Sequence, residues 1–506
     1  MTRVAIVVAG SRGDVQPFIA LALELKMLGV DVKLCCTAEM RHLCTPYLDE
    51  SETIYMPYSK AQTYLRDDPA MRKAMEEGDF MKIMGAMGNE TMVSPWVEDG
   101  KFLLKTLPAF DPQLVVFNTP GATHGSALAE ALKVPSTLVT MQMMLVSSYE
   151  APMIISPQTA AWLPSCVVRL LWHLLFVMMS YSPLFKRYDS EVRCKCIEGA
   201  RPMTYRETVA MVTGTSKRCS LVIARSPLLS PPPPDWSHPV TLVGPLILDA
   251  SLQVKAWPPS ASLKSFLADA DKPPIYFGWG SMIAGSPLHM VDLVCRTLMA
   301  VGRRGVVLGG WAELRAELLD SSTAPDASEL RAFARSQIHF IEQSAPHEWL
   351  FPQMDAIVHH GGAGTTGSAL RAGVPSIITP CAFDQPEIAA KVERQGGGIG
   401  LQQFHRVTVA QMTAAVARAI SDPVLRTSAA KLGAALRNER GAATTAALIA
   451  KRAREQAGEQ SEQDVELEVH AAPISPRVRG HSRNGRVAPA PMRTSLLSDP
   501  GHHNGC

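Results

Sequence analysis

Short apolar runs alternate with amphipathic stretches through the first 225 residues of the chain. Residues 4–8 are an apolar run of strand length, residues 30–36 are a second strand-like segment, and residues 18–28 between them have apolar side chains at helical spacing. The pattern returns further along, with strands at 114–118, 136–140 and 221–224 and a helix at 124–132. Strands that are separated by helices predict a parallel sheet that is covered on both faces.

The alternation restarts after four consecutive prolines at 231–234, which cannot continue a helix. Strand-like runs follow at 275–277, 305–308, 338–341, 356–359 and 376–379, with helical stretches at 288–301, 366–372, 409–420 and 424–454. This pattern predicts an α/β protein of two doubly wound, Rossmann-like domains, at 1–235 and 236–456. From residue 457 an acidic block precedes an Arg- and Pro-rich segment, so we expect a disordered tail over 457–506.

Composition narrows the function class. Apolar residues make up 46% of the 506 residues, which excludes wholesale disorder, and the net charge of +2 argues against a nucleic-acid binder. The 24 methionines and the low charged fraction of 19% suit a lipophilic partner, and they suit a large buried core equally well. The ten cysteines are scattered without paired spacing, and the N-terminus lacks the shape of a signal peptide, so we expect a cytoplasmic protein with free thiols.

One apolar run raises the question of membrane contact. Residues 167–181 read VVRLLWHLLFVMMSY, which is too short for a confident membrane span and is interrupted by Arg169 and His173. A helix that lies peripherally on a membrane and a helix that is buried in the first domain both fit this composition.

The most informative segment joins a strand to a helix in the second half. The strand at 356–358 runs into HHGGAGTT at 359–366, where glycines let the backbone approach an anion and the helix start offers free N–H groups. The hydroxyl of Thr365 and the imidazole of His360 can add donors. A tight turn without a ligand also fits, but the absence of a Walker lysine and of GxGxxG spacing excludes a P-loop ATPase and disfavours an NAD site.

Polar residues follow three other strands of the second half. Asp384 and Gln385 suit bidentate contacts to vicinal sugar hydroxyls, although a polar turn would use the same residues. Ser281 ends a glycine-rich loop that can reach a phosphate. The stretch 343–352, QSAPHEWLFP, ends a further strand, and its aromatic residues also fit core packing.

Several of these segments together resemble a known family. The sequence HHGGAGTT, followed by PCAFDQP and preceded by PHEWLFP, resembles the donor-site signature of the UDP-dependent glycosyltransferases with the two-domain GT-B fold. The sequence GSRGDVQP at 10–17 resembles the signature of one branch, the sterol 3-beta-glucosyltransferases. Bacterial relatives that glycosylate antibiotics and other lipophilic acceptors share much of it. The resemblance covers roughly residues 3–450 and implies two domains that face each other across a cleft.

The resemblance implies a role for each matching residue and UDP-glucose as the donor. Uridine would be bordered by Ser344, Ala345 and His347, and the diphosphate would be held by His360, Ala363, Gly364 and Thr365, with Ser281 nearby. The glucose hydroxyls would be held by Asp384 and Gln385. From the first domain, the donor would be reached by Ser11, Arg12 and Asp14. A helix dipole, backbone amides and a histidine can stabilise the departing UDP, so we expect inversion, no metal and no cofactor.

The acceptor hydroxyl needs a proton acceptor. Asp14 lies in the loop after the first strand, where doubly wound domains place catalytic groups, and the resemblance favours it as the base. Without the resemblance, a capping role at the start of the next helix is the simpler interpretation. His124, which follows Pro120 and Gly121, is the second candidate for the base, with acceptor contact or a structural role as alternatives.

The acceptor half departs from the family pattern. Residues 140–146 read TMQMMLV where the sterol enzymes usually carry a Met-Pro-Trp type segment. Met141, Met143, Met144 and Met153 fit a flexible apolar pocket and also fit ordinary core. We therefore expect a sterol as the acceptor, with another lipophilic alcohol as the alternative, and a non-catalytic sterol- or sugar-nucleotide-binding module as a further one.

Overall fold

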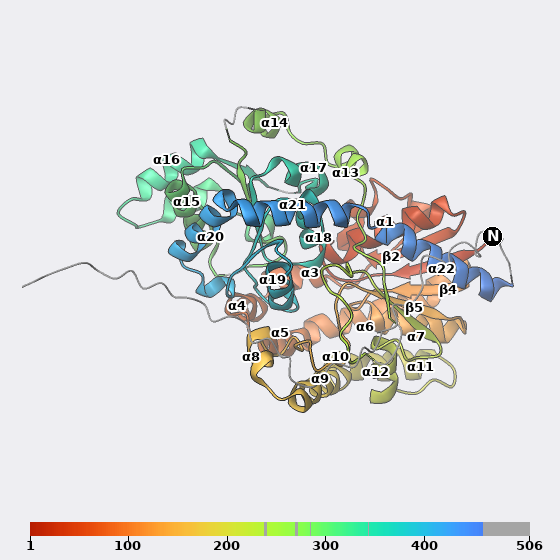
Figure 1. Ribbon diagram of the computed structural model, residues 1–506. Coiled ribbons are helices and arrows are strands. Elements are labelled where there is room, and N and C mark those ends of the chain that lie inside the picture. The colour runs from red at the N-terminus through yellow and green to blue at the C-terminus, as the bar shows by residue number, and fades with distance from the viewer. Residues whose placement is uncertain (237–239, 269–271, 284, 343, 459–506) are drawn as a thin grey trace, which may run out of the picture. The chain divides into compact units, whose positions relative to one another are not determined.

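Two parallel β-sheets organise the chain (Figure 1). This computed structural model describes residues 1–236, 240–268, 272–283, 285–342 and 344–458, so the predicted disordered tail lies outside the described residues from 459 onward. The first sheet contains β1 (Arg3–Val7), β2 (Asp31–Thr37), β3 (Thr53–Met56), β4 (Leu114–Phe117), β5 (Ser136–Thr140), β6 (Cys219–Ile223) and β7 (Thr241–Leu242). The second contains β8 (Ile275–Gly278), β9 (Gly305–Leu308), β10 (Ile338–Ile341), β11 (Ala356–His359), β12 (Ser376–Ile378) and β13 (Gly398–Gly400).

Both sheets have the strand order of a doubly wound fold. The orders are β3-β2-β1-β4-β5-β6-β7 and β10-β9-β8-β11-β12-β13, and all pairs are parallel. In β1, Val4 and Ile6 face one core while Ala5 and Val7 face another, and all four are fully buried. Burial on both faces explains why the strands read as continuous apolar runs. The predicted fold class is confirmed.

The helices cover both faces of the sheets. In the first half they are α1 (Arg12–Met27), α2 (Arg41–Cys44), α3 (Ala61–Asp67), α4 (Pro69–Glu77), α5 (Phe80–Met87), α6 (Glu90–Thr106), α7 (Ala122–Leu132), α8 (Pro157–Trp162), α9 (Ser165–Ser180), α10 (Pro183–Tyr188), α11 (Cys194–Cys196) and α12 (Tyr205–Val212). In the second half they are α13 (Ala250–Ala256), α14 (Ala261–Ala268), α15 (Pro287–Val301), α16 (Ala327–Gln337), α17 (His347–Leu350), α18 (Ala363–Ala372), α19 (Gln385–Arg394), α20 (Val409–Ser421), α21 (Pro423–Arg437) and α22 (Gly441–Ala457).

Two helices differ from the prediction. Helix α1 begins at Arg12 instead of residue 18, because Ser11 and Asp14 form a capping box that starts the helix ahead of Pro17. The predicted helix at 424–454 is two helices, α21 and α22, which are separated by residues 438–440.

The chain passes from the first sheet to the second later than the proline run suggests. Strand β7 pairs with β6, so the first sheet extends to Leu242 and the change of sheet falls between Leu242 and Ile275. Helix α22 then returns to the first sheet, where Ala446, Ala450 and Ala453 pack in the same core as α1. The segment 236–456 therefore includes one helix that completes the core of the first domain.

Helix α9 has two apolar faces. Val168, Trp172, Leu175 and Phe176 are buried in the core of the first domain. Leu170, Leu174, Val177 and Tyr181 lie on its other side, with exposed fractions of 66%, 47%, 38% and 58%. In the described part of the chain, no single helix is long and apolar enough to cross a membrane, and only the bent pair Ser165–Ser180 with Pro183–Cys196 passes by length and composition.

Candidate active site

Five loops bring the predicted site residues to the carboxyl ends of the strands. Residues 11–14 follow β1, Ser281 follows β8, residues 344–347 follow β10, residues 360–365 follow β11, and residues 384–385 follow β12. The strand order reverses between β1 and β4 and between β8 and β11. Open α/β sheets bind ligands at such switch points, because the loops on either side diverge there.

The loop after β1 meets the loop after β11. A Cβ placed on Gly364 would lie 3.9 Å from the carbonyl oxygen of Gly13. Burial lowers the pKa of His347 to about 3, and the nearby charge of Arg12 lowers it further. Such an effect requires proximity, so the structure brings predicted residues from both halves of the chain into one site.

The first turn of α18 offers unused backbone donors. The first described helical hydrogen bond runs from the amide of Thr366 to the carbonyl of Gly362, at 2.8 Å. Among the described hydrogen bonds, none uses the amides of Ala363, Gly364 or Thr365. Free amides together with the helix dipole attract an anion.

The imidazole ring of His360 lies against the backbone of Gly362, beside the first turn of α18. A Cβ on Gly362 would lie 2.4 Å from Nε2 of His360, so a side chain at 362 would displace the ring. Burial lowers the pKa of His360 to about 4, and a contact with the carbonyl of Gly278 opposes that shift. An anionic diphosphate beside the ring would oppose it further, because negative charge favours the protonated imidazole.

Arg12 supplies the positive charge from the first domain. Its guanidinium lies 5.7 Å from the ring centre of Trp257, and Nε donates to Oε1 of Gln16 at 2.9 Å. Burial lowers its pKa, and no carboxylate among the described residues forms an ion pair with it. A buried guanidinium without a carboxylate is suited to an anionic ligand.

Asp14 combines a capping role with an available oxygen. The amide and the hydroxyl of Ser11 both donate to Oδ2 of Asp14, at 2.8 Å and 3.1 Å, which makes Ser11 the N-cap and Asp14 the third residue of α1. No described hydrogen bond uses Oδ1. Burial raises the pKa of Asp14 to about 6, and the two bonds from Ser11 oppose that shift. The carboxylate can therefore cap the helix through one oxygen and accept a proton through the other.

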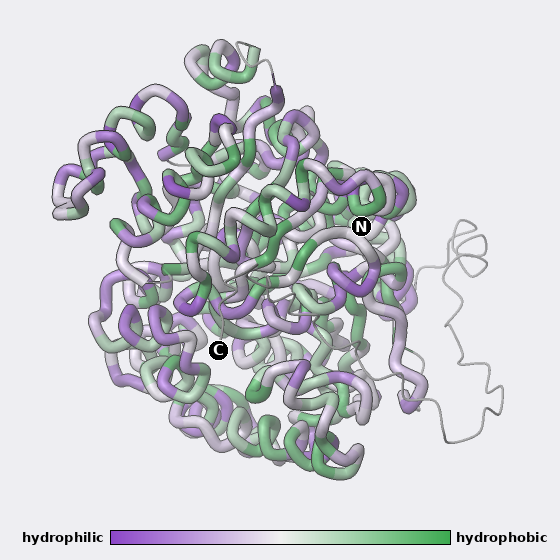
Figure 2. The backbone as a smooth tube through the Cα atoms, turned by 60° about the vertical axis from the view of Figure 1, so that its left-hand side comes forward, coloured by the Kyte–Doolittle hydropathy of each residue, from purple (hydrophilic) through white to green (hydrophobic). Residues whose placement is uncertain are grey.

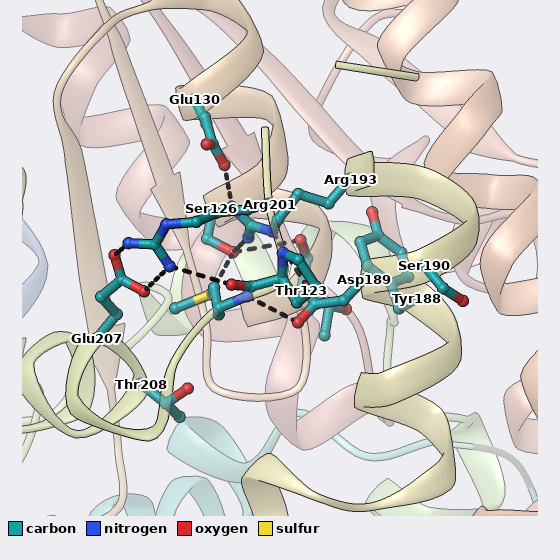
Figure 3. A network of polar contacts seen from close by, with 12 residues as sticks. Thr123, Ser126, Glu130, Tyr188, Asp189, Ser190, Arg193, Arg201, Glu207 and Thr208 are labelled. Atoms are coloured by element: carbon teal, nitrogen blue, oxygen red, sulfur yellow. Dashed lines mark hydrogen bonds and ion pairs between the residues drawn. The ribbon is translucent and has the colours of Figure 1, made fainter. Parts of the chain in front are cut away.

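His124 lies in a closed aromatic environment. Its ring stacks on Trp96 with centroids 4.1 Å apart, and Nδ1 is 2.8 Å from the hydroxyl of Tyr188. Burial lowers its pKa to about 3, which makes it a weak proton acceptor at neutral pH. Its helix α7 is tied to the segment after α10 by the polar network around the buried Arg193 (Figure 3). Nδ1 of His124 is therefore engaged by Tyr188, while its Nε2 is buried without a partner among the described residues.

The loop before α19 presents the predicted sugar-binding pair. Oε1 of Gln385 accepts hydrogen bonds from the amides of Cys381 and Ala382, at 2.7 Å and 3.0 Å, which leaves its NH₂ group for a ligand. Phe383 has a φ of 58°, a left-handed conformation that is costly for an aromatic residue. Such strain is typical of binding loops. Burial raises the pKa of Asp384 to about 6, and the charge of Arg225 opposes this.

Five buried polar atoms of these loops and of α18 have no hydrogen-bond partner. They are Oγ of Ser344, Nε2 of His347, Nδ1 of His360, Oγ1 of Thr366 and Oδ2 of Asp384, each unpaired within the described residues. Other such atoms lie elsewhere in the described chain, and these five are the ones that face the predicted donor site. No group of three or more His, Cys, Asp or Glu side chains in the described ranges is arranged to hold a metal ion.

A shallow, mostly apolar pocket adjoins Asp384. Met143, Met153, Trp172 and Phe383 line it, whereas Met144 is buried in the core and Met141 packs on the opposite face of the sheet. The sequence prediction of a methionine-lined pocket included two residues that line this pocket. It missed Trp172, because the apolar run at 167–181 carries no signal that separates a pocket wall from a membrane-contacting helix.

Comparisons with known proteins match both ends of the chain. The model of the glycosyltransferase family 28 N-terminal domain matches residues 4–84, and that of the erythromycin biosynthesis protein CIII-like C-terminal domain matches residues 307–455. A sterol 3-beta-glucosyltransferase of Arabidopsis thaliana is 28% identical over 87% of this chain and 66% of its own length. One of Aspergillus fumigatus is 27% identical over 87% of this chain and 29% of its own length. The chain thus spans less than two thirds of either relative.

Solved structures share the fold. The glycotransferase of kitacinnamycin has a TM-score of 0.59 at 18% identity, covering 89% of this chain and 99% of that one. The glycosyltransferase VinC, solved in complex with DTDP, has a TM-score of 0.55 at 17% identity, covering 90% and 100%. The strand orders and the solved structures show that the chain has a two-domain GT-B fold, and over 87% of its length its sequence is similar to those of sterol 3-beta-glucosyltransferases.

Proposed function

We propose that the protein transfers glucose from UDP-glucose to the hydroxyl of a sterol, with inversion and without a metal. The observation that carries this proposal is the pairing, in one site, of an anion cradle with a partly buried carboxylate. Arg12, His360 and the first turn of α18 form the cradle, and Asp14 is the carboxylate. The relatives named as sterol 3-beta-glucosyltransferases support the acceptor class.

The proposed reaction is a single displacement. The acceptor oxygen attacks the anomeric carbon, the bond from that carbon to the diphosphate oxygen breaks, and the acceptor proton passes to Oδ1 of Asp14. UDP leaves with an added negative charge, which the amides of α18, His360 and Arg12 stabilise. One displacement inverts the anomeric centre. Because fixed protein charges neutralise the leaving group, the reaction does not depend on a metal ion.

The substrates occupy the two sides of this site. Uridine lies against Ser344, Ala345 and His347, the diphosphate against α18 and Ser281, and the glucose hydroxyls against Asp384 and Gln385. The sterol occupies the apolar pocket beside Asp384, where Met143, Met153 and Trp172 contact its rings. The buried atoms without partners in the donor loops support this placement.

A panel of donors and acceptors tests the proposal. Purified protein is incubated with UDP-glucose, UDP-galactose or UDP-xylose and with a sterol or a non-sterol lipophilic alcohol, and products are identified by mass spectrometry. We expect a steryl glucoside from UDP-glucose, in the same yield with and without EDTA. If only the non-sterol alcohol were glucosylated, the proposed acceptor class would be wrong. If the substrates bound and no product formed, the protein would be a non-catalytic binding module.

The proposal includes peripheral contact with a membrane from the cytoplasm. The outer face of α9, at the lower edge of Figure 1, carries Leu170, Leu174, Val177 and Tyr181, and the lower edge of Figure 2 is coloured mainly as hydrophobic. The inner face of the same helix places Trp172 in the pocket. A lipophilic acceptor would thereby pass from the bilayer to the site along one helix.

The nine described cysteines carry free thiols, which suits a reducing compartment.

Vesicle flotation tests the membrane contact. We expect wild-type protein to float with phosphatidylcholine–phosphatidylserine vesicles that contain sterol, and the Leu170→Asp/Leu174→Asp variant to remain at the bottom, because two charges at the interface oppose insertion. The matched control is Met27→Asp/Val424→Asp, which changes side chains that are 73% and 77% exposed on other helices. Equal flotation of all three proteins would exclude this contact.

A further inference from the structure

Four charged side chains are buried side by side next to the sugar-binding loop. Arg225 and Glu150 come from the first domain, and Glu387 and Lys391 come from α19, with exposed side-chain fractions of 4%, 14%, 13% and 5%. Both Nη atoms of Arg225 lie 3.0 Å from Oε2 of Glu387, and Nζ of Lys391 lies 3.0 Å from Oε1 of Glu150. An ion pair between Glu387 and Lys391 completes a row of alternating charges.

This row joins the two domains at a defined point. Glu150 follows β5 and Arg225 follows β6, so both lie at the carboxyl edge of the first sheet. Glu387 and Lys391 are one turn apart on α19, whose preceding residue is Asp384. Helix α19 therefore meets the first domain through these charge pairs, and the loop before it does so through the contact between Phe383 and Phe80.

Stability alone does not explain such a row. Removing charges from water carries a penalty that their mutual attraction repays only in part, and apolar side chains of similar volume hold an interface at least as well. Ion pairs are more specific than apolar contacts, because each ion pair requires a particular partner at a particular distance. The row of charges is therefore better suited to fixing how the two domains are aligned than to holding them together.

The row is close to the atoms that would hold the sugar. Glu150, Asp384 and Glu387 line the same pocket. Arg225 lines a second pocket with Ala363 and Thr366 of α18, and its charge is close enough to Asp384 to lower the pKa of that carboxyl. Oδ2 of Asp384 is buried without a partner among the described residues.

We propose that Glu150, Arg225, Glu387 and Lys391 form an interdomain latch that positions Asp384 for the donor sugar, so that the sugar site is complete only when the first domain is docked on α19. The four are positioning residues, since they act through Asp384. The identity of the sugar rests on the proposed function. The nucleotide half of the donor does not use Glu150 or Lys391, because its predicted contacts lie in the loops after β1, β8, β10 and β11.

Comparing UDP with UDP-glucose isolates the latch. Calorimetric titration of the full chain with each ligand, without acceptor, gives two dissociation constants whose ratio reports the sugar contacts. We expect Lys391→Met and Glu150→Gln each to weaken UDP-glucose binding by about tenfold and to change UDP binding by less than about twofold. The double variant should be no weaker than Lys391→Met alone, because Lys391→Met already removes the pair that Glu150→Gln breaks. Lys391→Arg should recover part of the loss.

Two controls separate positioning from folding. The exposed pair Arg418–Asp422, also in the second domain, is the matched ion pair, and Arg418→Met should leave both constants unchanged. Thermal melting identifies any variant that fails to fold. If Lys391→Met fails to fold, the two dissociation constants are measured with Glu150→Gln, which changes the other domain. If Lys391→Met and Glu150→Gln weakened UDP and UDP-glucose equally, the row would serve only the fold.

The same titrations distinguish this inference from the proposed function. If the wild-type protein gains affinity from the sugar and both variants keep that gain, the latch is wrong and the donor assignment stands. If no sugar on UDP increases the affinity of the wild-type protein, the latch and the donor assignment are both wrong.

Discussion

Replacing Asp14 with asparagine is expected to lower kcat by roughly 10²- to 10⁴-fold, with little change in the KM for UDP-glucose. An asparagine keeps the shape of the side chain, and its oxygen can still accept the hydrogen bond from the amide of Ser11, so the cap persists while the base is lost. Initial rates with saturating donor and sterol measure the change. Full activity of this variant would show that Asp14 is not the base.

The pH profile provides an independent check on the same residue. Burial raises the pKa of Asp14 to about 6, so the base holds its proton up to a higher pH than an exposed aspartate does. The catalytic form is the ionised one, so kcat/KM should fall as the pH drops through about 6 and should level off above it. Asp384, with a pKa also raised to about 6 by burial, adds a second ionisation and steepens the fall.

A matched variant controls for capping. Glu207 is the corresponding acidic residue in the capping box of α12, on the surface of the first domain. Glu207→Gln should lower the melting temperature slightly and should leave the rate and its pH profile as they are. A similar loss of rate in Glu207→Gln and Asp14→Asn would attribute the effect to helix stability.

Replacing His360 with alanine is expected to lower kcat/KM by roughly 10²- to 10³-fold, in the range seen when one donor to a developing negative charge is removed. The ring is fixed between Gly280 and Gly362 beside the first turn of α18, so no other side chain moves easily into its place. The affinity for UDP should fall as well, because the departing UDP and bound UDP share the diphosphate. Titration with UDP and initial rates measure the two effects.

The exposed His405, in the same domain, is the matched control, and His405→Ala should change neither quantity. If His360→Ala bound UDP as tightly as the wild type and turned over at the same rate, the histidine would be a packing residue of the turn. Binding that is unchanged with a rate that falls would restrict its role to the transition state.

Local patterns were sufficient to predict most strands and the loops that follow them. The strands at 114–118, 305–308 and 356–359 are buried on both faces, so their residues are apolar or glycine apart from the terminal Asn118 and His359, and the run is visible without a structure. The predicted donor residues follow such strands directly. Their convergence is a consequence of parallel topology, and the structure brings the loops of both domains together as expected.

Contacts between distant segments were not predictable. Glu150 and Lys391 are separated by nearly half of the chain, and neither belongs to a motif, so nothing local marks them as partners. The apolar spacing predicts a start for α1 only at residue 18, because residues 12–17 are mostly polar, whereas the capping box of Ser11 and Asp14 determines the actual start. The break between α21 and α22 depends on where the last helix packs.

The return of the chain to the first domain through α22 has a mechanical consequence. The chain passes between the domains twice, after Leu242 and again before α22, and the two passages touch: a Cβ on Gly441 would lie 2.4 Å from the carbonyl oxygens of both Gly244 and Pro245. Ser226 donates to Glu439 at 2.6 Å beside this contact. Two passages that meet act as a pivot, about which the domains can rotate but cannot drift apart. Opening for product release would then be a rotation, and each closure would return Asp14 to the same place above α18.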